Sequence, residues 1–384
     1  MSEARINRIS NEKGDGGPSL SGITTFSGLN YFVPPKGTTA ERPSDCPPGS
    51  IRFNTDSAHL EYFDGLQWLE FEATNDELGV NGALGYRGGL VGGFGSSPNN
   101  PTDTIDYITI STLGNALDFG NIAGATRRDS LACLSSRTRV VHCGGNNSSS
   151  NAVDNMEYFT IASTGDSLNF GGLLNSGQKN PAACSDGVRG LIGGGYNGTD
   201  YTNVISYITI TNTAGSVDFG DLTSPGSEAS AVSSSTRGIW ANYYESPTFY
   251  NVIQYVTIST LGNAQDFGDM TTKRHSAGGA SNATRGVFGG GYTPGDTNSI
   301  EFITLSTLGN SQDFGDLTQA RNQVGACSSP IRAVWMGGQA SSTHVNTMDY
   351  VDLPSTGNAL DFGDLSVARR RVSAAGWSNG HGGL

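Results

Sequence analysis

One sequence unit occurs in six consecutive copies and dominates this chain. The copies read YITISTLGNALDFGNI from Tyr107, YFTIASTGDSLNFGGL from Tyr158, YITITNTAGSVDFGDL from Tyr207, YVTISTLGNAQDFGDM from Tyr255, FITLSTLGNSQDFGDL from Phe302 and YVDLPSTGNALDFGDL from Tyr350. The phenylalanine of the DFG or NFG triplet recurs every 47 to 51 residues. A period of this length is typical of repeat folds in which each copy is one supersecondary unit, so the repeat determines the architecture.

Each copy contains four strand-like pieces. Alternating apolar residues mark IEFITLS (300–306) as a strand, and RGVFGGGY (285–292), SQDFGDL (311–317) and VGACSS (324–329) supply three more. The STLGN turn offers Gly and Asn, which adopt left-handed backbone readily. Four short antiparallel strands per repeat predict one blade of a β-propeller.

The two ends of the array predict how it closes. The first copy begins at Arg87 without an inner strand before it, whereas VSAAGWSNG (372–380) is an inner strand with no copy after it. We therefore expect an all-β, six-bladed propeller over residues 86–384, closed by the C-terminal strand and preceded by a separate segment, residues 1–85. Closure removes free sheet edges, which are aggregation hazards. The alternative is an open solenoid.

Two recurrent motifs, DFG and the diglycine of GVFGGGY, are interpreted as structural parts of the repeat. The diglycine of GVFGGGY resembles the kelch repeat, although DFG replaces an aromatic that kelch units carry; the resemblance implies propeller geometry and not the partners of kelch proteins. A catalytic aspartate is needed once and not in every copy, so the DFG phenylalanine is expected to pack between blades. No helix follows GGGY, which argues against a phosphate-binding loop.

A second recurrent pair predicts a contact at the blade edge. An Arg opens the second strand of every copy, and an Asp starts the fourth strand of five copies. The Arg residues are Arg87, Arg139, Arg189, Arg237, Arg285 and Arg332, and the Asp residues are Asp118, Asp218, Asp266, Asp313 and Asp361. Either a repeated Arg–Asp pair or an Arg–carbonyl contact would explain this recurrence.

Candidate binding residues lie where the copies differ. The loops between strands two and three and those between copies fall on one face, here called the variable face, and variable polar loops on a rigid scaffold commonly carry binding sites. Its inter-copy loops hold much of the basic charge: Arg127, Arg128, Lys179, Lys273, Arg274, His275, Arg321, Arg369, Arg370 and Arg371. These are interpreted either as solvated loop charges or as a positive ring for an anionic glycan or an acidic protein.

The fourth copy breaks the pattern by replacing its diglycine with an aromatic cluster. The cluster contains Trp240, Tyr243, Tyr244, Phe249 and Tyr250. Exposed aromatics bind sugars or protein partners by stacking and apolar burial. The competing interpretation is a loop folded onto its neighbour.

No catalytic, metal or cofactor site is expected, since the five His lack metal-ligand spacing and no nucleophile motif occurs. Cys133, Cys184 and Cys327 occupy nearly the same place in three copies and are interpreted as small buried residues, with a Cys133–Cys143 disulfide as a less favoured alternative. The net charge of −13 disfavours nucleic acid and anionic membranes as partners. Neither a secretion signal nor a membrane span is apparent.

The N-terminal segment carries a second resemblance. The pattern GTTAERP, PGSIRFNTDS and LEYFDGLQW resembles a short module of tail-fibre and other virion proteins of tailed bacteriophages. The preceding SLSGITTFSGLNYFVPP is similar to structural proteins of marine cyanophage-type myoviruses. The resemblance covers residues 19–72. It implies a virion protein, assembled in the host cytoplasm, whose residues 1–85 contact other virion proteins and whose copies associate within the particle.

Three function classes follow. The first is a phage structural protein on the tail, neck or capsid whose propeller binds a host surface glycan or another virion protein. The second is a propeller enzyme that degrades host polysaccharide, and the third is an intracellular kelch-like interaction scaffold. We expect the first class and no enzymatic activity.

Overall fold

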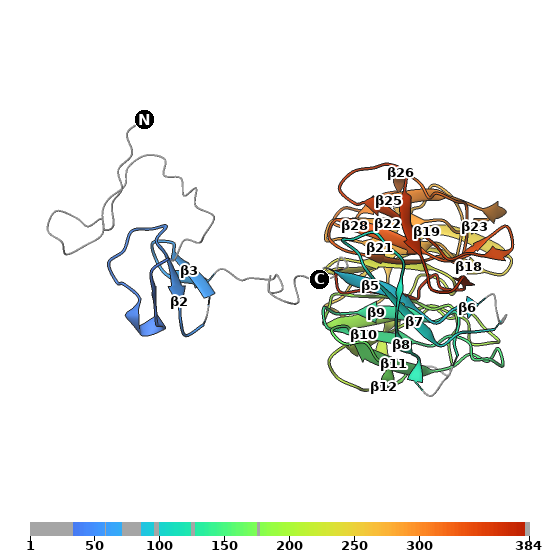
Figure 1. Cartoon of the computed structure of the whole chain (residues 1–384), viewed down its shortest axis with the longest axis horizontal. Coiled ribbons are helices and arrows are strands. Elements are labelled where there is room, and N and C mark those ends of the chain that lie inside the picture. The colour runs from blue at the N-terminus through green and yellow to red at the C-terminus, as the bar shows by residue number, and fades with distance from the viewer. Residues whose placement is uncertain are drawn as a thin grey trace. The chain divides into compact units, whose positions relative to one another are not determined.

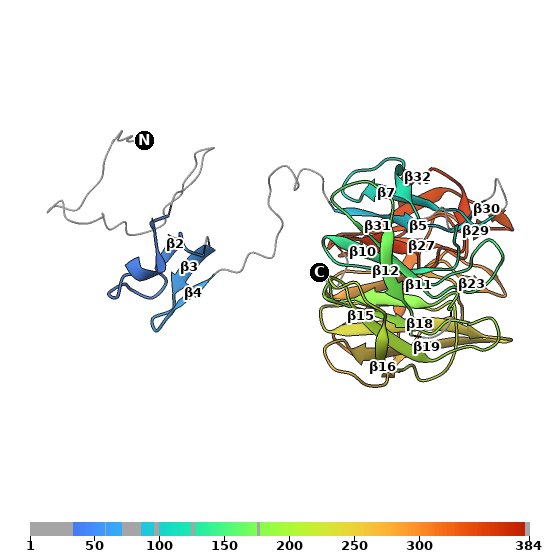
Figure 2. The same cartoon turned by 90° about the horizontal axis from the view of Figure 1, so that it is seen from below.

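The computed structural model describes residues 34–57, 59–70, 86–95, 100–123, 127–174 and 177–380. The chain divides into two compact units, Met1–Glu77 and Leu78–Leu384. The predicted boundary after residue 85 lies in residues 71–85, outside the described ranges, as does most of the predicted Ser19–Pro35 segment. The described residues are all-β with one 3₁₀ turn, η1 (Thr39–Glu41), and none of their helices has the length and apolar character needed to cross a membrane (Figures 1 and 2).

The first unit contains a four-stranded sheet with a polar buried face. Its strands β1 (Lys36–Gly37), β2 (Ile51–Asn54), β3 (His59–Phe63) and β4 (Trp68–Glu70) follow chain order, with β1 parallel to β2. Glu61 is fully buried, accepts a 2.5 Å hydrogen bond from Nη2 of Arg42, and lies 3.4 Å from Nε of Arg52. On the other side, Ile51 and Leu60 remain exposed. An ionic cluster thus holds this small sheet.

The second unit is built from four-stranded antiparallel sheets, which we number I to VI in chain order. Sheet I contains β34 (Gly376–Ser378), β5 (Arg87–Val91), β7 (Thr104–Thr109) and β8 (Leu117–Asn121). Sheet II contains β9 (Ala132–Ser135), β10 (Arg139–Cys143), β11 (Asn155–Thr160) and β12 (Leu168–Gly172). Sheet III contains β13 (Ala182–Ser185), β14 (Arg189–Gly193), β15 (Val204–Thr209) and β16 (Val217–Asp221).

The three later sheets repeat this order. Sheet IV contains β17 (Ser230–Ser233), β18 (Arg237–Glu245), β19 (Thr248–Thr257) and β20 (Gln265–Asp269). Sheet V contains β21 (Gly278–Ser281), β22 (Arg285–Gly289), β25 (Ser299–Thr304) and β26 (Gln312–Asp316). Sheet VI contains β27 (Gly325–Ser328), β28 (Arg332–Met336), β31 (Thr347–Asp352) and β32 (Leu360–Asp364). Two-residue ribbons pair β6 (Phe94–Gly95) with β33 (Arg369–Arg370), β23 (Tyr292–Thr293) with β24 (Gly295–Asp296), and β29 (Gln339–Ala340) with β30 (Thr343–His344).

Sheet I joins the two ends of the array. The predicted pairing of the C-terminal segment with the first copy is confirmed, because β34 pairs antiparallel with β5 and places Trp377 opposite Gly89. The segment that leads into β34 is longer than its counterparts. Six residues separate Arg371 from Ser378, whereas four separate Gln323 from Ser328 at the matching positions of sheet VI.

The DFG triplet is architectural, as predicted. All six phenylalanines are at most 3% exposed, and each meets the aromatic ring of the third strand edge-on or nearly so, at 5.8 to 6.1 Å between centroids. The following glycine approaches the neighbouring sheet. Gly315 has φ +147°, and a Cβ there would lie 2.4 Å from the carbonyl oxygen of Gly357. A side chain at that position would therefore push two sheets apart.

The second-strand arginines link each sheet to the next. Arg285 of sheet V lies over the Phe302 ring at 4.5 Å, and its Nη1 donates to the Leu353 carbonyl of sheet VI at 2.6 Å. The equivalent bonds join Arg87 to Ile161, Arg139 to Ile210, Arg189 to Ile258, Arg237 to Leu305 and Arg332 to Ile110. The predicted Arg–carbonyl contact is confirmed. The alternative Arg–Asp pair is wrong, since the five fourth-strand aspartates are exposed.

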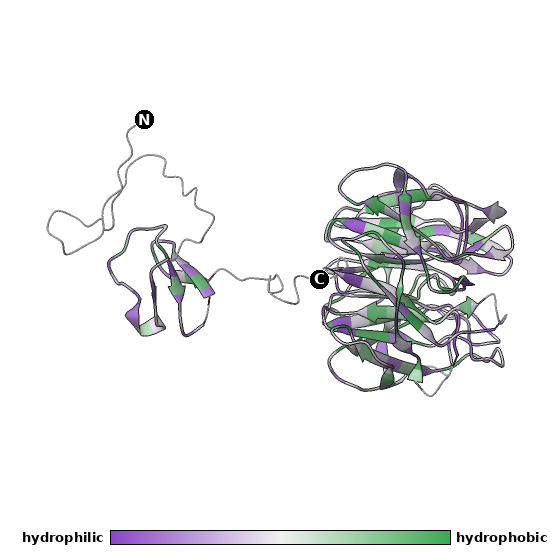
Figure 3. Ribbon diagram, viewed as in Figure 1, coloured by the Kyte–Doolittle hydropathy of each residue, from purple (hydrophilic) through white to green (hydrophobic). Residues whose placement is uncertain are grey.

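Hydrophobic and hydrophilic residues both occur along the strands of the second unit (Figure 3). The core lies between the sheets, where apolar side chains from neighbouring sheets form shared clusters. Trp377 of sheet I, for example, packs on Phe119 of its own sheet and on Phe159 of sheet II. All five cysteines are free, and Cys133, Cys184 and Cys327 are buried as predicted.

Candidate functional site

Four of the ten residues of the predicted positive ring are buried. Arg128, Arg274, Arg321 and Arg369 are at most 2% exposed, so both the solvated and the ligand-binding interpretations are wrong for them. Each pairs with an acid on the third strand of its own sheet, the partners being Glu157, Glu301, Asp349 and Asp106. These arginines serve the core, because a buried guanidinium is stable only when a charge and hydrogen-bond acceptors satisfy it.

A signal for this burial exists in the sequence. The two copies that lack the arginine also lack the acid: Gln178 matches Ser206 in sheet III, and Gly226 matches Gln254 in sheet IV. Because the arginine and the acid are absent together from the same copies, the sequence indicates that the two side chains contact each other where both are present. The exposed charges that remain are Arg127 and Lys273, while Arg370 and Arg371 are partly buried.

The aromatic cluster of sheet IV divides into core and surface. Trp240 is 1% exposed and donates its indole N–H to the Ala182 carbonyl at 3.2 Å, and Trp335 occupies the same position in sheet VI. Tyr243 is 5% exposed and fills the space beside Gly226, where the other copies place a larger residue. The prediction that Trp240 and Tyr243 contact a partner is therefore corrected. Tyr244, Phe249 and Tyr250 stay partly exposed.

A polar hollow of about 360 Å³ opens among the inter-copy loops of the variable face. Six residues at one repeat position, all with left-handed backbone, supply side chains to its wall: Ser130, Asn180, Glu228, Ser276, Gln323 and Arg371, with φ between 54° and 60°. Left-handed backbone is strained for residues other than Gly. A chain with 55 Gly nevertheless places none of them here, so these positions retain side chains despite the strain.

Main-chain hydrogen bonds join these six positions into a ring. The amide of Asn180 donates to Ser130, Glu228 to Asn180, Ser276 to Glu228, Gln323 to Ser276, Ser130 to Arg371, and Val372 to Gln323, at 2.7 to 3.4 Å. A separate cavity of about 10 Å³ is lined by four of these residues, Ser130, Asn180, Glu228 and Arg371, and by residues that follow them in the chain. A cavity of that size is at the limit for one water molecule.

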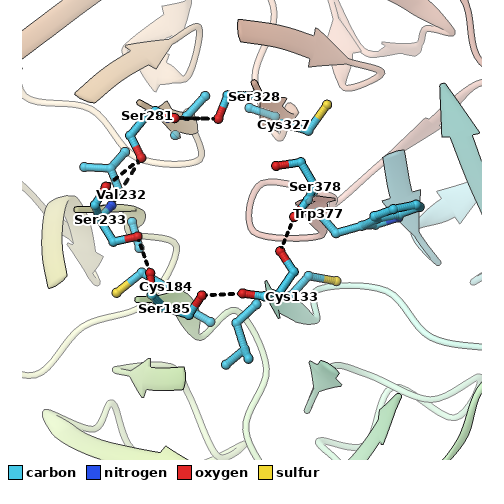
Figure 4. Close-up of a pocket in the computed structure, with 18 residues that line it drawn as sticks. Cys133, Cys184, Ser185, Val232, Ser233, Ser281, Cys327, Ser328, Trp377 and Ser378 are labelled. Carbon is cyan, nitrogen blue, oxygen red and sulfur yellow. Dashed lines mark hydrogen bonds between the residues drawn. The ribbon is translucent and has the colours of Figure 1, made fainter. Parts of the chain in front are cut away.

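Further along the inner strands a narrow space of about 70 Å³ is bordered by serines (Figure 4). Ser185 donates to the Ser135 carbonyl, Ser233 to Ser185, Ser281 to Ser233 and Ser328 to Ser281, at 2.5 to 3.0 Å. Ser135 donates to Ser378, whereas Oγ of Ser378 has no partner among the described residues. The serines satisfy carbonyls at the free edge of each inner strand, so this space is structural.

Glu228 is the acidic centre of the hollow. Its carboxylate lies 2.6 Å from Nδ1 of His275, accepts a short hydrogen bond from Ser276, and accepts another from Asn180 at 3.2 Å. Burial by itself raises the pKa of Glu228, but the hydrogen bonds and charges of His275, Ser276 and Arg371 outweigh it and lower that pKa. The trio is no catalytic triad, because Ser276 and Glu228 both contact the same imidazole nitrogen.

A continuous arc of aromatic rings borders the hollow. Tyr196 contacts Tyr201 within sheet III, and Tyr201 contacts Tyr244 of sheet IV. Tyr244 and Phe249 contact each other and both contact His275 of sheet V, while Tyr292 contacts Phe249 and His275. The centroid separations are 4.9 to 6.3 Å. All six rings are partly exposed. Sequence reasoning found Tyr244, Phe249 and His275 but missed Tyr196, Tyr201, Tyr292 and Glu228, because their proximity arises only between separate sheets.

The hollow combines charged, amide, hydroxyl and aromatic side chains. No group of three His, Cys, Asp or Glu in the described residues is placed to hold a metal ion. Comparison with protein-family models and with curated proteins finds no match to this chain. The site must therefore be interpreted from its own geometry.

Proposed function

We propose that the second unit is a six-bladed β-propeller that binds a surface partner without catalysis, within a structural protein of a tailed bacteriophage particle. The arginine links support the propeller, because they run from each sheet to the next and the last, from Arg332, reaches Ile110 of sheet I. Contacts between successive inner strands, including β34 with both β9 and β27, support the same closure. An open solenoid would leave the final arginine without its carbonyl.

The aromatic arc is the observation that carries the binding function. Partly exposed rings from three consecutive sheets touch one another beside a polar hollow, on loops that differ from copy to copy. Tyrosine combines a large apolar ring with a hydroxyl, which suits it to sugar rings and protein surfaces. We take the partner to be a glycan of the host surface.

The virion assignment rests on the N-terminal resemblance. Residues 19–72 resemble a module of phage virion proteins, and this resemblance implies that residues 1–85 contact other virion proteins and leave the propeller free to bind. Several copies on one particle would multiply weak contacts, because each later contact is effectively intramolecular.

Two measurements test this proposal separately. Mass spectrometry of purified particles should detect the chain, and its absence would refute the virion assignment. Purified full-length protein should bind host cells, and Tyr201→Ala with Tyr292→Ala should abolish most of that binding, while Leu308→Ala, an exposed apolar residue in a strand three–strand four turn, should not. Binding to the particle in place of cells would make another virion protein the partner.

A further inference from the structure

We infer that the hollow holds the terminal unit of a neutral saccharide chain, while the aromatic arc supports the units that follow. This inference rests on the proposed binding function and specifies its ligand. Three features carry it: unsatisfied acceptors, balanced charge and a closed end.

The wall of the hollow contains hydrogen-bond acceptors that lack donors. Oδ1 of Asn146 and Oε1 of Gln323 have no hydrogen-bond partner among the described residues, although both atoms are buried. Asn146 is 7% exposed, and its Nδ2 donates to Oδ1 of Asp129 at 3.1 Å, which fixes the orientation of the amide. Leaving such acceptors unsatisfied costs about 1–3 kcal/mol each. Both residues line the hollow, so a small shift of either amide oxygen toward it would let hydroxyl groups of a bound ligand supply the missing donors.

Charges around the hollow offset one another. Arg371 and Lys179 line it together with Glu228, and Arg371 lies 3.4 Å from the buried carboxylate of Asp129. Lys179 sits over the Tyr196 ring at 5.0 Å. The two cations and the carboxylates of Glu228 and Asp129 balance, so the hollow offers no excess positive charge to an anionic sugar. A neutral sugar can donate to the carboxylate of Glu228 and accept from Lys179 and Arg371, which matches this mixture of groups.

Shape selects the end of a chain. The hollow, at about 360 Å³, is within the ~300–1,000 Å³ range of ligand pockets, yet the two cavities described toward the inner strands are only about 10 and 70 Å³. A saccharide chain therefore cannot continue from the hollow toward the inner strands. It can leave over the arc, since Tyr196, Tyr201 and Tyr244 border the hollow and Phe249 and Tyr292 continue outward.

The first experiment uses ligand-detected NMR with the full-length protein. The probes are methyl glycosides of glucose, galactose, mannose and N-acetylglucosamine, with glucuronic acid and N-acetylneuraminic acid as anionic counterparts. We expect saturable binding of at least one neutral glycoside in preference to both acids. No binding of any neutral probe at tens of millimolar, or preference for an acid, would overturn the inference.

Variants then locate the bound sugar. Gln323→Leu removes one unsatisfied acceptor and should weaken binding about tenfold, the equivalent of about 1.4 kcal/mol. Tyr201→Ala should have a similar effect through lost stacking. Gln312→Leu, the same change at an exposed position of β26, is the matched control and should leave affinity unchanged. Unchanged affinity in both hollow variants would place the sugar elsewhere.

Oligosaccharides test the closed end. A trisaccharide with the recognised sugar at its terminus should bind at least as well as the monosaccharide. One in which that sugar is flanked on both sides should bind at least tenfold more weakly. Equal affinity would refute terminal recognition. If cell binding persists while every sugar probe fails, the proposed function survives and only the ligand assignment is lost.

Discussion

Arg274 and Glu301 lie buried against each other in sheet V, with Nη2 of the arginine 3.4 Å from Oε1 of the glutamate and neither side chain more than 1% exposed. The same relationship occurs in sheets I, II and VI, and both partners are absent from sheets III and IV. The repeat therefore tolerates either the complete pair or the replacement of both residues. Replacing only one of the two residues should destabilise the second unit.

Arg274→Gln by itself should destabilise the second unit by about 3 kcal/mol, because it leaves the Glu301 carboxylate buried without its countercharge. Arg274→Gln with Glu301→Ser copies the Gln178 and Ser206 of sheet III and should recover more than half of that loss. Chemical denaturation followed by tryptophan fluorescence measures both. Additive losses in the double variant would show that the two side chains do not interact.

His142 should make the second unit less stable as the pH falls. It is fully buried, and burial, together with the charge of Arg128, holds the pKa of its imidazole well below the ordinary value. The unfolded chain therefore takes up a proton below about pH 6.5 that the folded chain does not, which costs up to about 1.4 kcal/mol per pH unit.

His142→Leu should remove this part of the pH dependence, because Leu90 occupies the same repeat position in sheet I. Unfolding free energies at about pH 7 and pH 5 provide the comparison, with a difference of about 2 kcal/mol between wild type and variant. His59→Asn in the first unit serves as control. An unchanged pH profile in His142→Leu would mean that another group dominates.

Trp377→Cys should destabilise the second unit by about 3–5 kcal/mol, even though Cys184 and Cys327 occupy the same position of other inner strands. Trp377 is 2% exposed and packs on Phe119 and Phe159. The smaller side chain therefore leaves a cavity where the C-terminal strand joins the first copy of the repeat. Thermal unfolding measures the loss. Cys327→Ala, a smaller change at the same repeat position, should cost markedly less.

Arg237→Lys should weaken the link between sheets IV and V. The guanidinium lies 4.9 Å from the Tyr255 ring and donates to the Leu305 carbonyl at 2.8 Å, a combination that an ammonium group does not reproduce. We expect a loss of about 1 kcal/mol in the free energy of unfolding. Arg127→Lys, an exposed change outside this network, should be neutral; a similar loss there would indicate a general effect of the substitution.

The sequence predicted the elements that every copy shares. The period, the four strands, the burial of the DFG phenylalanine, the pairing of the C-terminal strand and the Arg–carbonyl link follow from residues that recur at fixed positions. Such features are local or depend on one neighbouring copy, so alternation, turn chemistry and repetition reveal them. The prediction was wrong for Arg128 and Arg274, because a charged residue in a loop usually faces solvent, whereas these two are buried against acids of the third strand.

By itself the sequence determined a repeat of β units with a variable set of loops and a distinct N-terminal segment. Only the tertiary structure decided that four loop arginines turn inward and that Trp240 and Tyr243 belong to the core. It also decided that Tyr196, Tyr201 and Glu228 line one hollow, with Tyr292 in the adjoining aromatic arc. These residues come from different copies, many positions apart. Their distances are set by how whole sheets pack against one another, which no local pattern along the chain encodes.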